Sequence, residues 1–294
     1  MSILKSIFFV ITHPYNAHKK TEALFRVIWW KINQVFFKAP VIIPFASNLK
    51  IICYPDSSYG SLIVYVHNPE HEEMSFISRY LKKKDIVFDI GANIGALSLL
   101  SYSKTAHTVY AFEPTPSIVN RFVENIKLNS LENFIKVFPF AVSNKNGFIS
   151  FSVSQESERN HISFQKTSEK SKKRKVKAVT LDSFCKNHKI PQIDLLKIDV
   201  EGGEMLVFKG MKNLFKNKQV PTIIFEWNKN APYFDYSILD LEKMFTEYGY
   251  LLYTIEDRGF LKLFHREKFD VLQTQNLVAV LKSNTRIQKY IQKD

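Results

Sequence analysis

The sequence predicts an α/β fold built around one doubly wound, largely parallel sheet. From residue 85 onward, short apolar runs alternate with segments of helical periodicity, which is the pattern of βαβ units with a buried parallel sheet. A Gly-x-Asn-x-Gly turn stands where the first of these runs meets a helix. The chain has 294 residues, of which 45% are hydrophobic, so it can bury one large core or two small ones.

The first long helix is predicted over residues 20–38. Apolar side chains recur there at three- and four-residue spacing, Arg26 and Lys31 lie between them, and Trp29 and Trp30 widen the apolar face. Such a helix either packs on the main domain or on a partner copy in a homo-oligomer, or it lies on an anionic membrane surface. Both interpretations stay open at this point.

The rest of the expected accessory region, residues 1–84, contains a hairpin and a second helix. β-Branched and aromatic runs at 41–54 and 61–66 flank a turn-prone segment and predict the hairpin, and helical periodicity predicts the helix at 70–83. The early apolar run at 7–11 is far shorter than the roughly 18 residues of a membrane-spanning helix, and it does not make a signal peptide. We therefore expect a cytoplasmic protein, with the inner face of the membrane as its location if the first helix docks there.

The main domain is expected over residues 85–283, followed by a tail at 284–294. About seven strands are predicted, at residues 86–90, 108–112, 135–138, 194–198, 222–225, 250–255 and 277–281. Helices are predicted between them, at residues 94–103, 117–128, 181–188, 205–215 and 239–248. A hairpin is predicted at residues 148–153.

A polar insertion interrupts the domain at residues 155–177 and carries much of the positive charge. The chain has 41 Lys+Arg and 28 Asp+Glu, a formal net charge of +13, and seven of the basic residues lie between 166 and 177. No aromatic residue lies among them, so the segment can attract phosphates but cannot stack on bases. We expect a solvated loop, with an anionic glycan, lipid or nucleic acid as alternative ligands. Because no RNA-binding module is recognisable, no specific nucleic-acid partner is expected.

A cofactor-binding turn is predicted where the first strand of the domain meets its helix. Small residues there let a ligand approach the backbone, and the helix N-terminus offers unpaired N–H groups. The residues expected to take part are Asp89, Gly91, Ala92, Asn93 and Gly95. Glu113 follows 24 residues after Asp89, the spacing at which a carboxylate accepts hydrogen bonds from ribose hydroxyls, so the pair predicts a nucleoside-containing cofactor. Since Asp89 would repel a pyrophosphate, the cationic amino-acid end of S-adenosylmethionine suits this turn better than a dinucleotide does.

A second polar cluster is predicted at the carboxyl ends of two later strands. Lys197, Asp199 and Glu201 alternate with apolar residues, so they project to one side of an extended strand end. Glu226 ends the following strand and comes near Asp199 if the two strands are neighbours. Because ligands of open α/β sheets bind at this edge, the cluster is interpreted as a catalytic or metal site rather than a surface salt-bridge patch.

Five sequence blocks, in this order, resemble the FkbM-type S-adenosylmethionine-dependent methyltransferase family. They are residues 87–95, 111–114, 141–143, 180–182 and 196–202 together with Glu204. The resemblance implies a Rossmann-like methyltransferase sheet whose last strand is antiparallel, and methyl transfer to a hydroxyl oxygen, often of a sugar in a bacterial surface glycan. It adds Pro114, Ala141 and Val142 to the expected cofactor-binding residues. Gly203, where the family commonly has Ala, and the basic insertion are departures from the pattern.

We therefore expect an O-methyltransferase acting on a glycan or glycolipid-type acceptor. The sulfonium methyl of S-adenosylmethionine is already activated, so the enzyme must hold a hydroxyl oxygen about 3 Å from it and help to remove the proton. Asp199 is the first choice for the base, and Lys197 is expected to orient the carboxylates or to stabilise the alkoxide. Asp199, Glu201 and Glu226 also form the predicted site for Mg²⁺ or Mn²⁺. An RNA methyltransferase and a non-catalytic binding module are the alternatives.

Overall fold

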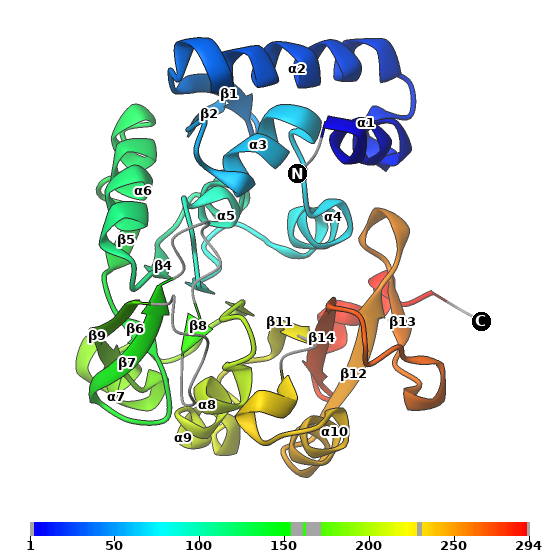
Figure 1. Cartoon of the computed structure of the whole chain (residues 1–294). Helices are drawn as coiled ribbons and strands as arrows, with labels where there is room; N and C mark the ends of the chain where they lie inside the picture. The colour runs from blue at the N-terminus through cyan, green and yellow to red at the C-terminus, as the bar shows by residue number, and fades with distance from the viewer. Residues whose placement is uncertain (1–2, 154–160, 163–171, 228–230, 293–294) are drawn as a thin grey trace.

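A computed structural model describes residues 3–153, 161–162, 172–227 and 231–292, and it confirms the α/β fold (Figure 1). Eight described strands form one mixed sheet, in the spatial order β13 (Leu261–Leu263), β12 (Tyr250–Ile255), β14 (Gln275–Leu281), β11 (Thr222–Trp227), β10 (Leu195–Ile198), β3 (Val87–Ile90), β4 (Val109–Phe112) and β5 (Ile135–Phe138). The run from β11 to β5 is parallel, and β14 is inserted antiparallel between β11 and β12. This is the expected Rossmann-like sheet with its last strand antiparallel, plus one additional edge strand, β13.

Helices cover both faces of the sheet, because successive strand residues point to opposite sides. Val87 and Leu195 belong to the core on one face, whereas their neighbours Phe88 and Leu196 belong to the core on the other. The first face is covered by α4 (His71–Tyr80), α5 (Ala96–Thr105) and α6 (Pro116–Leu128). The second is covered by α7 (Leu181–His188), α8 (Glu204–Lys209), α9 (Lys212–Lys216) and α10 (Ile238–Glu247). Short 3-10 turns complete the domain, at η3 (Ala231–Phe234), η4 (Asp257–Gly259), η5 (Arg266–Lys268) and η6 (Thr285–Tyr290).

The N-terminal region packs over the first face. Its elements before α4 are α1 (Ile3–Thr12), η1 (Pro14–Asn16), α2 (Lys20–Ile32), the π-helical turn η2 (Asn33–Phe37), β1 (Val41–Phe45), β2 (Leu49–Cys53) and α3 (Ser58–Val66). The predicted helices at 20–38 and 70–83 are confirmed in outline, and α2 is the outermost element at its end of the molecule (Figure 1). In the described part of the chain, no helix is both long and apolar enough to span a bilayer.

The hairpin prediction for this region was wrong in its second strand. Residues 58–66 form α3, and the hairpin lies wholly within 41–53, where β1 pairs with β2. The hydroxyl of Ser57 caps α3 by accepting a hydrogen bond from the backbone N–H of Gly60 at 2.7 Å. The apolar run that suggested a strand is buried on a helix instead, because a short continuous apolar run does not distinguish the two.

A second, four-stranded sheet changes the interpretation of the insertion. It consists of β6 (Ala141–Val142), β9 (Lys172–Val179), β7 (Gly147–Val153) and β8 (His161–Ile162). Residues 172–177, predicted as loop, are therefore strand, with Lys175 and Lys177 exposed and Val176 buried between them. The rest of the predicted loop lies outside the described residues, apart from β8. The hairpin predicted at 148–153 is the single strand β7.

One predicted helix is divided in two. Residues 205–215 belong to α8 and α9, with Gly210 between them. A Cβ at Gly210 would lie 2.2 Å from the carbonyl oxygen of Ser143, so the close packing of the backbone there requires glycine.

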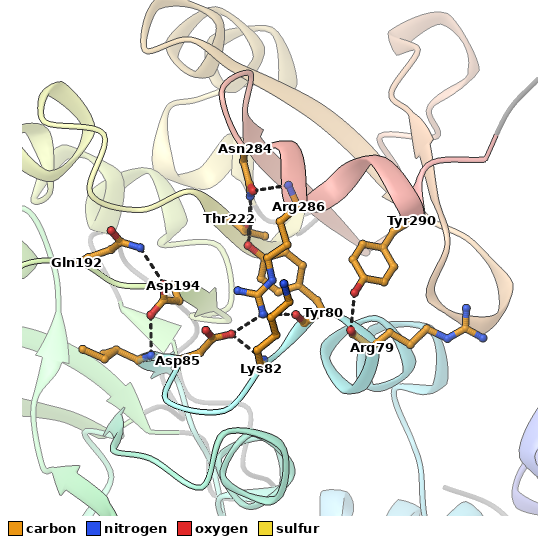
Figure 2. A network of polar contacts seen from close by, with 11 residues as sticks. Arg79, Tyr80, Lys82, Asp85, Gln192, Asp194, Thr222, Asn284, Arg286 and Tyr290 are labelled. Carbon is orange, nitrogen blue, oxygen red and sulfur yellow. Dashed lines mark hydrogen bonds and ion pairs between the residues drawn. The ribbon is translucent and has the colours of Figure 1, made fainter.

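The C-terminal segment fastens α4 to the amino ends of the central strands (Figure 2). Arg286 pairs with Asp85 just before β3, at 2.5 Å between Nη2 and Oδ2, and also donates to the backbone carbonyl of Tyr80. The hydroxyl of Thr222 donates to the Tyr80 hydroxyl at 2.8 Å, and the Asn284 amide donates to both oxygens. The segment expected as a tail is thus packed on the N-terminal region.

Candidate active site

A cavity of about 260 Å³ lies at the carboxyl ends of β3, β4, β10 and β11. It is lined by every residue predicted for binding or catalysis except one: Asp89, Gly91, Ala92, Asn93, Glu113, Pro114, Ala141, Val142, Lys197, Asp199, Glu201 and Glu226. The exception is Gly95, which precedes α5 at φ +89°. A Cβ there would lie 2.0 Å from Cε2 of Phe122, so Gly95 serves the packing of α5 against α6.

The turn after β3 touches the loop after β10. The N–H groups of Gly91 and Ala92 both donate to the carbonyl of Phe112, at 2.9 and 3.1 Å, and the N–H of Asp199 donates to the carbonyl of Ile90 at 2.9 Å. Gly91 has a φ of +78°, and a Cβ on it would lie 1.8 Å from the carbonyl oxygen of Asp199. Only glycine allows this approach, which unites the predicted cofactor turn with the predicted catalytic loop.

Glu113 is fixed at the end of β4 by backbone donors. The N–H of Thr115 donates to Oε1 at 2.8 Å and the N–H of Asn93 donates to Oε2 at 3.3 Å. Burial raises the pKa of Glu113 to about 7, because these hydrogen bonds offset only part of the desolvation of its charge. Each carboxylate oxygen can accept further hydrogen bonds, so the group is preorganised for hydroxyl donors.

The buried carboxylate of Asp89 has a hydrogen-bond partner among the described residues for only one of its two oxygens. Its Oδ2 accepts a hydrogen bond from the Ser98 hydroxyl at 2.6 Å, whereas its Oδ1 is buried and has no hydrogen-bond partner among the described residues. Asp89 is 2% exposed, and burial raises its pKa. Because leaving a buried acceptor unpaired costs about 1–3 kcal/mol, the free oxygen in this cavity marks a position for a donor or cation on a ligand.

One buried ammonium is shared by several carboxylates. Lys197 lies 2.9 Å from Asp199, between Nζ and Oδ2. Burial by itself lowers the pKa of Lys197, but Asp199, Glu73, Glu70 and Asp89 together hold it well above its ordinary value. Burial in turn raises the pKa values of Glu70 and Glu73, the latter strongly. The surrounding carboxylates therefore favour the charged form of Lys197, while burial favours the neutral forms of Glu70 and Glu73.

The residues that close the cavity from the N-terminal side were not predicted from the sequence. Ser58, Tyr59 and Leu62 come from α3, and Glu70 directly precedes α4. They were missed because they belong to no motif and reach the site only through the packing of the N-terminal region. The one available signal was Glu73, a carboxylate placed four residues before Ile77 on the apolar face of the predicted helix.

A second cavity, of about 490 Å³, adjoins the first, and Glu70 lines both. The ends of β12, β13 and β14 and the start of α4 enclose it. The Asn276 amide donates to Oε2 of Glu73 at 2.7 Å, whereas Oε1 of Glu73 is buried without a partner among the described residues. Asn276 is also the register partner of Glu226, so the second cavity opens beside the predicted catalytic cluster. Two lysines, Lys262 and Lys268, lie along its outer part.

The predicted metal site is not supported. The described residues include no group of three or more His, Cys, Asp or Glu side chains arranged to hold a metal ion. Asp199 is paired with the ammonium of Lys197, which thus takes the cationic position among the carboxylates that Mg²⁺ or Mn²⁺ was expected to occupy. Glu201 and Glu226 line the cavity without completing a metal site.

The chain is similar in sequence to a known methyltransferase domain. The model of the methyltransferase FkbM domain matches residues 89–252, more than half of the chain. The hexuronic acid methyltransferase AglP of Haloferax volcanii is 27% identical over 150 residues, which are 50% of this chain and 59% of AglP, less than two thirds of that relative.

Solved structures show weaker likeness. The methyltransferase domain of METTL16 superposes with a TM-score of 0.46 at 14% identity, covering 88% of this chain and 79% of that one. TrmK of M. capricolum, in complex with S-adenosyl-homocysteine, superposes with a TM-score of 0.41 at 14% identity, covering 72% and 68%.

Proposed function

Because the chain belongs to the FkbM methyltransferase family, we propose that it transfers the methyl group of S-adenosylmethionine to a hydroxyl oxygen of a sugar in a glycan or a glycan precursor. One observation carries the proposal. One cavity is lined by the fixed carboxylate of Glu113 and by Asp89, whose Oδ1 has no partner among the described residues. The Lys197–Asp199 pair lines the same cavity.

The cofactor side of the cavity is built by β3, β4 and β6. We propose that Glu113 accepts hydrogen bonds from the two ribose hydroxyls and that Oδ1 of Asp89 faces the cationic end of the cofactor. A cation placed there would favour ionised Asp89 and relieve the cost of its burial. Pro114, Ala141 and Val142 supply an apolar wall. S-adenosylmethionine supplies, when bound, a methyl group activated by its sulfonium sulfur.

We propose that the acceptor sugar occupies the second cavity. Its hydroxyls would hydrogen-bond to the carboxyl groups of Glu70 and Glu73 and accept from Asn276, which is the polar pattern that a polyhydroxyl ligand requires. The name of the AglP relative, a hexuronic acid methyltransferase, favours a sugar that carries a carboxylate.

Asp199 is the proposed base. Its side chain is 30% exposed, so an acceptor can reach it, and the pairing with Lys197 fixes the carboxylate. Asp199 would accept the proton of the acceptor hydroxyl, while bound S-adenosylmethionine would supply the activated methyl group. Lys197 orients the base and stabilises negative charge that develops on the acceptor oxygen, while Glu201 and Glu226 line the reaction space.

Titration calorimetry of the purified protein tests the cofactor assignment. We expect binding of S-adenosylmethionine and S-adenosylhomocysteine but not of NAD⁺, and loss of this binding in Glu113→Ala. Glu132→Ala, an exposed carboxylate outside both cavities, is the matched control and should bind normally. Absence of S-adenosylmethionine binding in the unaltered protein would refute the proposal.

Transfer of a labelled methyl group to uronic and neutral sugar acceptors tests the reaction. Asp199→Asn should keep cofactor binding and lose turnover. If Asp199→Asn transfers methyl groups as fast as the unaltered protein, Asp199 is not the base. If RNA is labelled and none of the tested sugars is, the acceptor is RNA and the proposed sugar acceptor is wrong.

A further inference from the structure

We propose that the outer face of the N-terminal helices docks on an anionic phospholipid bilayer. This face, which we call the docking surface, consists of the exposed apolar side chains of α1, α2 and η2. Its main members are Leu4, Phe8, Phe25, Trp29, Phe36 and Phe37. The proposal concerns where the protein lies and does not depend on the reaction that it catalyses.

Helix α2 is apolar on two sides, of which the fold uses one. Ala23, Val27 and Trp30 are fully buried against the core. Phe25 and Trp29, four residues apart on the other side, are 78% and 48% exposed. A helix with exposed apolar side chains outside the stripe that faces the core is expected to bind a second apolar surface.

The neighbours of α2 also carry exposed apolar side chains. Phe36 and Phe37, on the turn that ends α2, are 77% and 72% exposed. Helix α1 contacts α2 and adds exposed Leu4 and Phe8. In Figure 1, α2 runs along the outside of the molecule, with the sheet on its inner side. Nothing in the described fold therefore covers this side of α2.

The charge of this region identifies the occupant. Residues 1–54 contain seven Lys and Arg but one acidic residue, Glu22. Lys19 and Lys20 at the start of α2 and Lys38 after η2 are exposed, so positive charge flanks the aromatic side chains at both ends. Aromatic rings combined with flanking lysines are the composition of a helix that lies in the headgroup region of an anionic membrane. A second copy of this chain would instead bring like charges together, which opposes a dimer through the same face.

Vesicle binding followed by tryptophan fluorescence tests the proposal on the full chain. Trp30 and Trp227 are buried, so Trp29 is the solvent-exposed reporter among the three tryptophans. Vesicles of phosphatidylcholine with about one third phosphatidylglycerol should shift the emission to the blue, shield it from acrylamide and carry the protein in flotation. Vesicles of phosphatidylcholine alone should bind at least about tenfold more weakly, because the attraction of lysines to anionic lipid is lost.

Two kinds of variant distinguish this surface from general stickiness. Phe25→Ser combined with Phe36→Ser should reduce vesicle binding by about tenfold or more, since two exposed aromatic anchors are lost. Leu272→Ser is the matched control, because Leu272 is 79% exposed but lies in the C-terminal half, and it should bind as the unaltered protein does. Lys19→Glu combined with Lys20→Glu removes positive charge without touching the apolar residues, so it tests the proposal even if the serine variant folds poorly.

Three results would overturn the proposal. The first is that the protein does not bind anionic vesicles. The second is that the serine and the glutamate variants both bind vesicles as the unaltered protein does. The third is that the protein binds no vesicles but forms a dimer in sedimentation velocity, which the serine substitutions dissociate. The last result would assign the same face to a second copy of the chain.

Discussion

Replacement of Gly91 by alanine should separate the two halves of the proposed active site. Gly91 has a φ of +78°, and its added Cβ would lie 1.8 Å from the carbonyl oxygen of Asp199. Gly249 has nearly the same φ, +82°, but nothing lies within 4 Å of the position that its Cβ would take. The pair of variants, Gly91→Ala and Gly249→Ala, therefore differs in steric contact while sharing the same unfavourable backbone conformation.

The magnitude follows from these two contributions. An alanine held at positive φ costs about 1–2 kcal/mol in either variant. At Gly91 the contact with Asp199 must also open from 1.8 Å to at least 3.0 Å, which displaces packed backbone. Overpacking of this kind costs about 1–3 kcal/mol more. The N–H of Asp199 is bonded to the carbonyl of Ile90 at 2.9 Å, so the same displacement strains the link between β3 and β10.

Urea unfolding and cofactor titration measure the two expected effects. Gly91→Ala should lose about 2–5 kcal/mol of unfolding free energy and Gly249→Ala about 1–2 kcal/mol. Gly91→Ala should also bind S-adenosylmethionine more weakly, whereas Gly249→Ala should not. Equal losses of stability in the two variants, with unchanged cofactor affinity, would refute the inferred contact between the turn and the Asp199 loop.

Three further predictions concern charged groups. Because burial raises the pKa of Glu113 to about 7, the native state binds more protons than the unfolded state between about pH 4.5 and 7. The unfolding free energy therefore falls as the pH rises through this range. Glu113→Gln should remove about 3 kcal/mol of that fall, measured by denaturation at pH 5 and pH 8. Lys197→Met should destabilise the protein by about 3–5 kcal/mol at pH 8 and by less at pH 5, where the neighbouring carboxylates can be neutral, and equal losses at both pH values would contradict the shared-ammonium arrangement. Arg286→Ala should cost about 3 kcal/mol in urea unfolding by leaving Asp85 unpaired, with cofactor affinity unchanged; an unaltered midpoint would show that the pair contributes nothing.

The geometry of the predicted cofactor turn could be inferred from the sequence because its residues are close in sequence and its contacts are local. A strand, a glycine at positive φ and a carboxylate at the end of the next strand follow one another within about 25 residues, and the parallel order brings them to one edge. Lys197 and Asp199 were placed correctly for the same reason, since strand alternation alone puts them on one side.

The wall opposite that turn was not predictable in the same way. Glu70 and Tyr59 reach the cavity because α3 and α4 fold back over the sheet, and no spacing in the sequence encodes that contact. The strand expected at 61–66 is a helix because the Ser57 cap and burial decide between two conformations that the same apolar run allows. The predicted metal site is not supported among the described residues, because the ammonium of Lys197 lies among the carboxylates that were expected to hold the ion.

The way α4 is held has a consequence for the order in which the protein can fold. Helix α4 is made early in synthesis, yet its polar partners come late: Asn276 lies 203 residues after Glu73, and Arg286 lies 206 residues after Tyr80. Contacts of such long sequence separation close late, because a long loop must be ordered before they form. While the ribosome is still making the last strand, the nascent chain lacks the contacts that hold α4, and Glu70, which directly precedes α4, lines both cavities. Both proposed binding places are therefore expected to be completed only after the C-terminal segment has been made.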